Sequence, residues 1–171
     1  MSTVPEPWLR GPLPGISAEL QPVAHALVAA LEDTTAVVEA LDPSEVWADP
    51  GGAASIGFHL LHLAGATDRL FTYARGEALS GEQKAALGRE RTLPDPRPTG
   101  AELLEAWRAV VDRAMAELRA TPDAVLPSPR GVGRAQLPTT VRGLLFHAAE
   151  HAQRHAGQMV TTAKILRGRR G

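Results

Sequence analysis

The sequence predicts an all-α protein, a four-helix bundle with one additional short helix. Four long segments carry apolar residues at the three- and four-residue spacing of amphipathic helices, and capping residues or prolines bound them. No segment has the features of a strong β-strand. The chain has 171 residues, of which 44% are hydrophobic, which is enough for the core of one domain. We therefore expect a single helical domain over residues 1–171.

Each expected helix begins at a residue type that caps helix N-termini. The helices are expected over residues 17–41, 55–74, 80–91 and 99–119, and from Thr139 or Thr140 to 166. The capping residues are Ser17, Ser55, the capping-box pair Ser80 and Gln83, and the pair Thr99 and Glu102. These caps and the apolar stripes together define the order of the elements.

Prolines and glycines end the helices and form the segments between them. The residue before a proline is pushed out of the α region, so residues 42–43 and 121–122 should end the first and fourth helices. Residues 75–76 (Arg-Gly) should end the second. A rigid proline-rich connector is expected over 94–98 and a loop over 127–138.

The two ends of the chain differ in composition from the helices. Residues 1–16 are rich in proline and glycine and should form an extended lead-in, with Trp8 and Leu9 pinning it to the domain. Residues 167–171 form a basic tail that complements the dipole of the last helix.

Composition excludes several classes of function. Eighteen Lys and Arg against 19 Asp and Glu give a formal net charge of −1, which argues against a nucleic-acid binder. The absence of cysteine removes disulfides, cysteine zinc sites and a cysteine nucleophile. No apolar run approaches the roughly 20 residues that span a bilayer, and prolines interrupt the region where a signal peptide would be apolar. We expect a cytoplasmic protein with neither nucleic-acid nor membrane partners.

Histidine is the one residue type with an unusual distribution. Five of six histidines fall in two windows, at His59 and His62 and at His147, His151 and His155. Helical residues four apart share a face, so the last three offer paired imidazoles to one metal ion. His151 and His155 lie at the edge of and inside the apolar stripe, whereas His147 lies outside it. The third ligand should come from the second helix, where His59 lies closer than His62 to the apolar centre.

The sixth histidine, His25, lies among apolar residues of the first helix and is interpreted as a structural residue.

Two stretches resemble the DinB superfamily of DinB/YfiT-like metalloenzymes. These are Ser-Ile-Gly-Phe-His-Leu-Leu-His-Leu-Ala over 55–64 and His-Ala-Ala-Glu-His-Ala-Gln-Arg-His-Ala-Gly-Gln over 147–158. The resemblance implies a DinB/YfiT-like four-helix bundle, a homodimer, and a divalent ion such as zinc or nickel. It places the metal ligands on His62, His151 and His155, although the angular positions of the residues around the second helix favour His59 over His62 as the third ligand.

Further residues are candidates for contacts around the metal or for lining a cavity beside it: His59, His147, Gln158 and Tyr73. No catalytic residue is assigned, since Glu150 should point away from the histidine stripe. Three histidine ligands leave a coordination position open, which is typical of catalytic sites.

The predicted function is that of a metal-dependent enzyme that activates a small-molecule thiol or water, for transfer or hydrolysis. Because the chain has no cysteine, any thiol in the reaction would be a bound low-molecular-weight compound rather than a side chain of the protein. The alternative is a non-catalytic bundle with a structural or adventitious metal and a partner-binding role.

Overall fold

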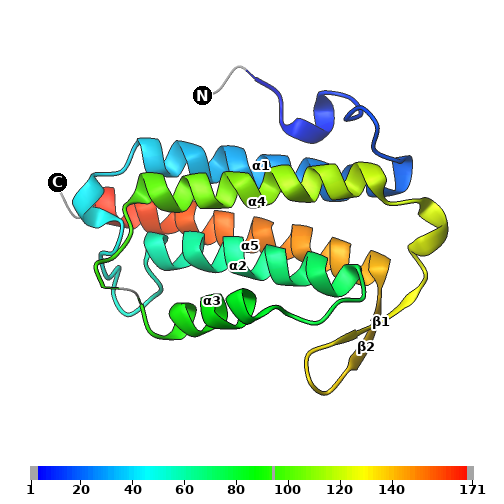
Figure 1. The fold of residues 1–171 in the computed structure, drawn as a ribbon. Coiled ribbons are helices and arrows are strands. Elements are labelled where there is room, and N and C mark those ends of the chain that lie inside the picture. The colour runs from blue at the N-terminus through cyan, green and yellow to red at the C-terminus, as the bar shows by residue number, and fades with distance from the viewer. Residues whose placement is uncertain (1–3, 94, 169–171) are drawn as a thin grey trace.

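The computed structural model describes residues 4–93 and 95–168 and confirms the helical bundle (Figure 1). Its long helices are α1 (Gln21–Glu39), α2 (Ile56–Ala74), α4 (Gly100–Ala120) and α5 (Val141–Gly168). The additional short helix is α3 (Gly81–Arg91). Single-turn 3-10 helices lie at Pro7–Leu9, Ala18–Leu20, Pro43–Glu45 and Asp123–Val125. Among the described residues, no helix combines the length and apolar character needed to cross a membrane.

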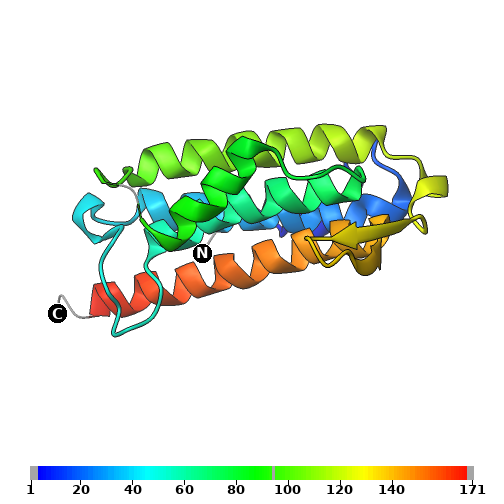
Figure 2. The same cartoon turned by 60° about the horizontal axis from the view of Figure 1, so that its bottom comes forward.

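The four long helices form a ring around one apolar core. Helices α1 and α2 each pack against both α4 and α5, and α3 lies outside the ring against α2 (Figures 1 and 2). The core includes fully buried residues from several of these helices, among them Leu27, Leu60, Trp107 and Met159. This packing brings the two histidine-bearing helices, α2 and α5, side by side.

Most of the predicted caps are confirmed. Ser55 accepts a hydrogen bond from the Phe58 amide at 3.2 Å, and both capping boxes are complete. The start of the last helix, left open between two threonines, falls at Thr140, whose Oγ1 accepts from the Gly143 amide at 3.0 Å. Local side-chain chemistry therefore sets these helix starts.

The predicted N-cap Ser17 is wrong. Helix α1 begins at Gln21, after a 3-10 turn over Ala18–Leu20. The hydroxyl of Ser17 is buried and has no hydrogen-bond partner among the described residues. The Ser17 carbonyl instead accepts from the amides of Leu20 and Gln21, both at 3.1 Å, so the backbone rather than the side chain closes this end.

The segment 127–138, expected to be a loop, contains part of a β-hairpin. Strand β1 (Pro129–Val132) pairs antiparallel with β2 (Leu137–Thr140). Each strand has four residues, too few to show an alternating pattern, and Gly131 and Pro138 hide the signal. The hairpin lies at the end of the bundle where α5 begins (Figure 1).

The lead-in is attached differently from the prediction. Trp8 and Leu9 are 62% and 58% exposed, whereas Pro7 is buried. Polar contacts hold the segment: the His25 ring lies 3.0 Å from the Gly11 carbonyl. His25 is thus a structural residue, as the sequence indicates. Residues 1–3 of the lead-in, Pro94 of the connector and residues 169–171 of the basic tail lie outside the described residues.

Replacing Thr99 by alanine should lower the free energy of unfolding by about 1 kcal/mol, because the helix loses a side-chain N-cap. The Thr99 hydroxyl accepts from the Glu102 amide at 3.2 Å. Urea denaturation followed by circular dichroism measures the change. Thr161→Ala is the control: its exposed hydroxyl bonds only a carbonyl within α5, and an effect as large as that of Thr99→Ala would contradict the capping role.

Candidate metal centre

Three histidine rings converge from α2 and α5. His62, His151 and His155 each offer one nitrogen, and the three nitrogens all lie within 4.8 Å of one another. The three residues are half-buried. The two on α5 are one helical turn apart and therefore share a face, and the packing of α2 on α5 supplies the third. Long-range packing thus completes the set that the i, i+4 pair begins.

Glu90 of α3 orients the His62 ring. The Nδ1 of His62 lies 2.7 Å from Glu90 Oε2, and its Nε2 faces His151 Nε2 at 2.9 Å. A carboxylate can only accept, so Nδ1 carries the hydrogen and the lone pair lies on Nε2. A carboxylate bonded to the far nitrogen of a histidine is the arrangement that fixes the tautomer and orientation of metal-ligating histidines.

A buried ion pair places Glu90. Arg69 of α2 donates to Glu90 from Nη1 at 2.6 Å and from Nη2 at 3.2 Å. Glu90 and Arg69 are only 8% and 9% exposed. Gly65 leaves room for the pair, since a Cβ there would collide with Glu90 Oε1 and lie 2.6 Å from Arg69 Nη1.

These contacts keep Glu90 ionised. Burial by itself would raise the pKa of the Glu90 carboxyl, but hydrogen bonds from His62 and Arg69, and the Arg69 charge, lower the pKa below its ordinary value. A carboxylate with both oxygens engaged in this way is a positioning group rather than a free base.

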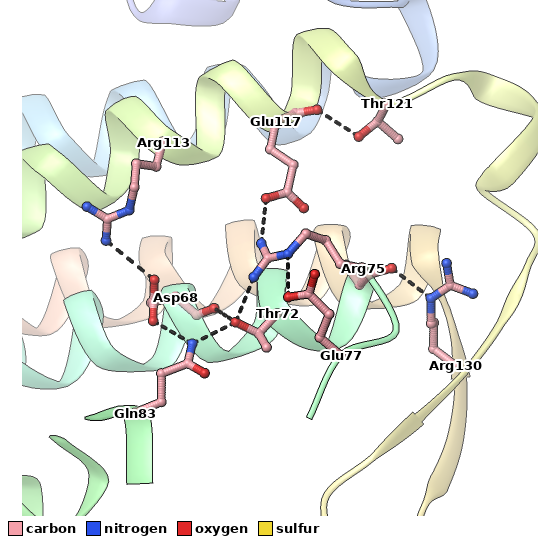
Figure 3. Close-up of polar contacts among 10 residues, drawn as sticks. Asp68, Thr72, Arg75, Glu77, Gln83, Arg113, Glu117, Thr121 and Arg130 are labelled. Carbon is pink, nitrogen blue, oxygen red and sulfur yellow. Dashed lines mark hydrogen bonds and ion pairs between the residues drawn. The ribbon is translucent and has the colours of Figure 1, made fainter. Parts of the chain in front are cut away.

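Polar contacts anchor the other end of α3 to α2 (Figure 3). Gln83 Nε2 donates to Asp68 Oδ2 and to Thr72 Oγ1, both at 2.6 Å. Helix α3 is therefore held on α2 by Gln83 near its start and by Glu90 near its end. The sequence analysis missed Glu90 because α3 has no apolar stripe; the signal that could have indicated it is Gly65, one turn after His62.

His59 contacts the site from behind His155. The two Nδ1 atoms lie 2.8 Å apart, which leaves Nε2 of His155 as its free ligand atom. His59 is only 5% exposed, as its central azimuth predicts. The angular positions around α2 thus identify the more buried histidine of this helix correctly. The three-nitrogen group nevertheless contains His62, because a ligand has to lie where the two helices meet rather than within the core.

Burial keeps the imidazoles of His59, His151 and His155 neutral. It lowers the pKa of His151 to about 4 and that of His155 to about 3, with smaller contributions from neighbouring histidines. Burial, with the neighbouring His62, also lowers the pKa of His59. Neutral rings present the lone pairs that a metal requires.

The remaining candidates lie farther from the cluster. His147 is exposed, its ring centroid is 5.5 Å from that of His151, and its Nδ1 is 3.2 Å from Glu150. Glu150 also pairs with Arg154 and so lies on the outer surface of α5. Gln158 is exposed and has no hydrogen bond to the cluster among the described residues. Tyr73 lines a separate cavity.

The residues present fit a divalent ion. Two Nε2 atoms face each other at 2.9 Å with the Nδ1 of one already bonded to a carboxylate, and the third ring is neutral and close by. Three imidazoles from two helices form the donor set of an open zinc-type site, and imidazole equally suits nickel, copper and iron. The Nδ1 of His151 is buried without a hydrogen-bond partner among the described residues.

This fold and cluster define a helical-bundle protein with inward-facing histidines between two of its helices. The chain belongs to the DinB superfamily, whose family model matches residues 26–159. No curated protein matches the sequence.

Solved structures share the fold at low sequence identity. A conserved protein from Enterococcus faecalis is similar with a TM-score of 0.69 and 20% identity, over 87% of this chain and 97% of that one. YfiT from Bacillus subtilis, described as a probable metal-dependent hydrolase with an unusual four-helix bundle topology, is similar with a TM-score of 0.63 and 16% identity. That match covers 90% of this chain and 91% of YfiT. The comparisons support the DinB/YfiT-like bundle predicted from the sequence.

Proposed function

We propose that this protein is a metal-dependent enzyme in which His62, His151 and His155 hold one divalent ion, zinc or nickel. The observation that carries the proposal is the convergence of one nitrogen from each ring within 4.8 Å. The proposed reaction is hydrolysis, and the description of the similar YfiT as a probable metal-dependent hydrolase supports it.

The ion, when bound, would polarise a water or thiol and bring its pKa toward neutrality. The chain's own residues serve to hold and orient the ligands. Glu90 holds the hydrogen on Nδ1 of His62, and His59 engages Nδ1 of His155. Phe58 stacks on the His62 ring with centroids 5.7 Å apart and an interplanar angle of 3°, which limits rotation of that ring.

His151→Ala should abolish stoichiometric metal binding, because only two of the three imidazole ligands then remain, one on α2 and one on α5. The measurement is elemental analysis of protein purified without a histidine tag and dialysed against one equivalent of zinc. His147→Ala is the matched control, one turn earlier on α5 and outside the three-nitrogen group, and it should keep one ion per chain. Equal metal content in both variants would overturn the proposal.

Thiol-dependent transfer is the second candidate. The absence of cysteine is compatible with it, because a small molecule would supply the thiol, but it is equally compatible with hydrolysis. Cobalt-substituted protein distinguishes the two reactions. Under the hydrolytic proposal, bacillithiol or mycothiol leaves the visible and near-ultraviolet spectrum unchanged. A new near-ultraviolet thiolate-to-cobalt band on addition of either thiol contradicts hydrolysis and favours transfer.

A further inference from the structure

A second feature of this side of the bundle is an open cavity of about 650 Å³ where α2, α3 and the hairpin meet. Tyr73 of α2, Leu79 of the α2–α3 connection and Leu87 of α3 give it apolar walls. No histidine lines it among the described residues. Its volume lies in the range of small-molecule sites, about 300–1,000 Å³.

The cavity continues the surface on which the histidine cluster lies. His62, Arg69 and Tyr73 lie within about 40° of one another around α2, and Tyr73 is about 16 Å beyond His62 along the helix axis. Leu87 lies on α3 one turn before Glu90. The buried Arg69–Glu90 pair is thus situated along α2 between the cavity and the cluster.

Two glycines of the hairpin, Gly131 and Gly133, line the cavity. A Cβ on Gly131 would lie 2.9 Å from the side-chain Cδ of Gln136, so the hairpin closes on itself there. Gly133 adopts a φ of +67° and has nothing within 4 Å of a Cβ position. A side chain at Gly133 would thus meet open space and strained backbone rather than a packed neighbour.

The cavity carries uncompensated positive charge. Lys84 and Arg134 line it, and among the described residues the side chain of neither one makes an ion pair or hydrogen bond. Among the described residues, Glu77 is the one acidic residue that lines the cavity, and it is already paired with Arg75 at 2.8 Å (Figure 3). Two free cations beside apolar walls favour a ligand with an acidic group and an apolar body.

We propose that this cavity binds an amphipathic small-molecule anion. Its acidic group lies between Lys84 and Arg134, and its apolar part lies against Tyr73, Leu79 and Leu87. The site does not use the metal, so the inference goes beyond the proposed function and stands or fails separately from it.

The test uses 8-anilinonaphthalene-1-sulfonate, a fluorescent anion with an apolar body, titrated into the full-length protein. The double charge reversal Lys84→Glu, Arg134→Glu should weaken its binding at least about tenfold, since attraction becomes repulsion. Leu87→Trp, which fills the cavity, should also weaken binding. Arg89→Glu is the matched control, because Arg89 is exposed on the same helix and does not line the cavity.

Competition identifies the chemistry of the ligand. Hexanoate should displace the dye at a concentration at least about tenfold lower than hexanamide, which has the same shape without the charge. The inference is overturned if the double variant binds the dye as the wild type does, if Leu87→Trp has no effect, or if the acid and the amide compete equally. Dye binding that persists in protein without metal supports this inference, even where His151→Ala shows that the metal proposal fails.

Discussion

Glu90→Ala should lower the free energy of unfolding by about 3–5 kcal/mol, because it leaves the buried Arg69 guanidinium without its partner. The same change removes the acceptor for Nδ1 of His62, 2.7 Å away. Loss of such an outer contact lowers metal affinity about 10–100-fold. Chemical denaturation measures the first effect, and zinc titration against a competing chelator measures the second.

A double variant separates the two effects. Arg69→Met with Glu90→Leu replaces the ion pair by apolar side chains, and such replacements are often neutral or stabilising. We expect the free energy of unfolding to return toward that of the wild type while metal affinity stays low. If the double variant binds zinc as tightly as the wild type, Glu90 does not orient His62. Glu82→Ala, an exposed change at the start of α3, should cost less than about 1 kcal/mol.

His59→Phe should lower metal affinity by about 10–100-fold, because His155 loses the neighbour that sets its ring orientation. His59 Nδ1 lies 2.8 Å from His155 Nδ1, and phenylalanine keeps a ring in this buried position while removing the bond. The measurement is the zinc dissociation constant by chelator competition, with circular dichroism to confirm that the variant is folded.

His59→Gln tests whether the bond or the packing matters. The glutamine oxygen can accept from His155, so affinity in this variant should stay within a fewfold of the wild type. His25→Ala is the histidine control, because the His25 ring is hydrogen-bonded to the Gly11 carbonyl of the lead-in and is not part of the three-nitrogen group. An unchanged dissociation constant in His59→Phe would show that the contact between the two rings is not used.

The polar helix α3 shows which features could be predicted from the sequence and which could not. Its capping box, Ser80 with Gln83, was predicted and is confirmed, because both partners lie within one turn. That α3 would supply a buried carboxylate to the histidine cluster was not predicted. Glu90 looks like any charged residue of a solvated helix until α3 docks on α2 and meets Arg69 and the space at Gly65.

The hairpin shows the same limit. Four-residue strands with an internal glycine or proline have no periodicity to detect, so the sequence predicts only a loop. The cavity that the hairpin shares with α3 was therefore beyond prediction as well, although Tyr73 was already a cavity candidate by its azimuth near His62.

Sequence by itself determined the bundle, most helix starts and the pair His151 and His155, because helical periodicity, caps and i, i+4 spacing act within one or two turns. The resemblance to the DinB superfamily had already placed His62 with this pair, whereas only the tertiary structure decided that His59 lies behind His155, that Glu90 orients His62, and how the lead-in is attached. Those outcomes depend on which helices touch and at what register, and the free energy of that packing comes from contacts between residues far apart in the chain.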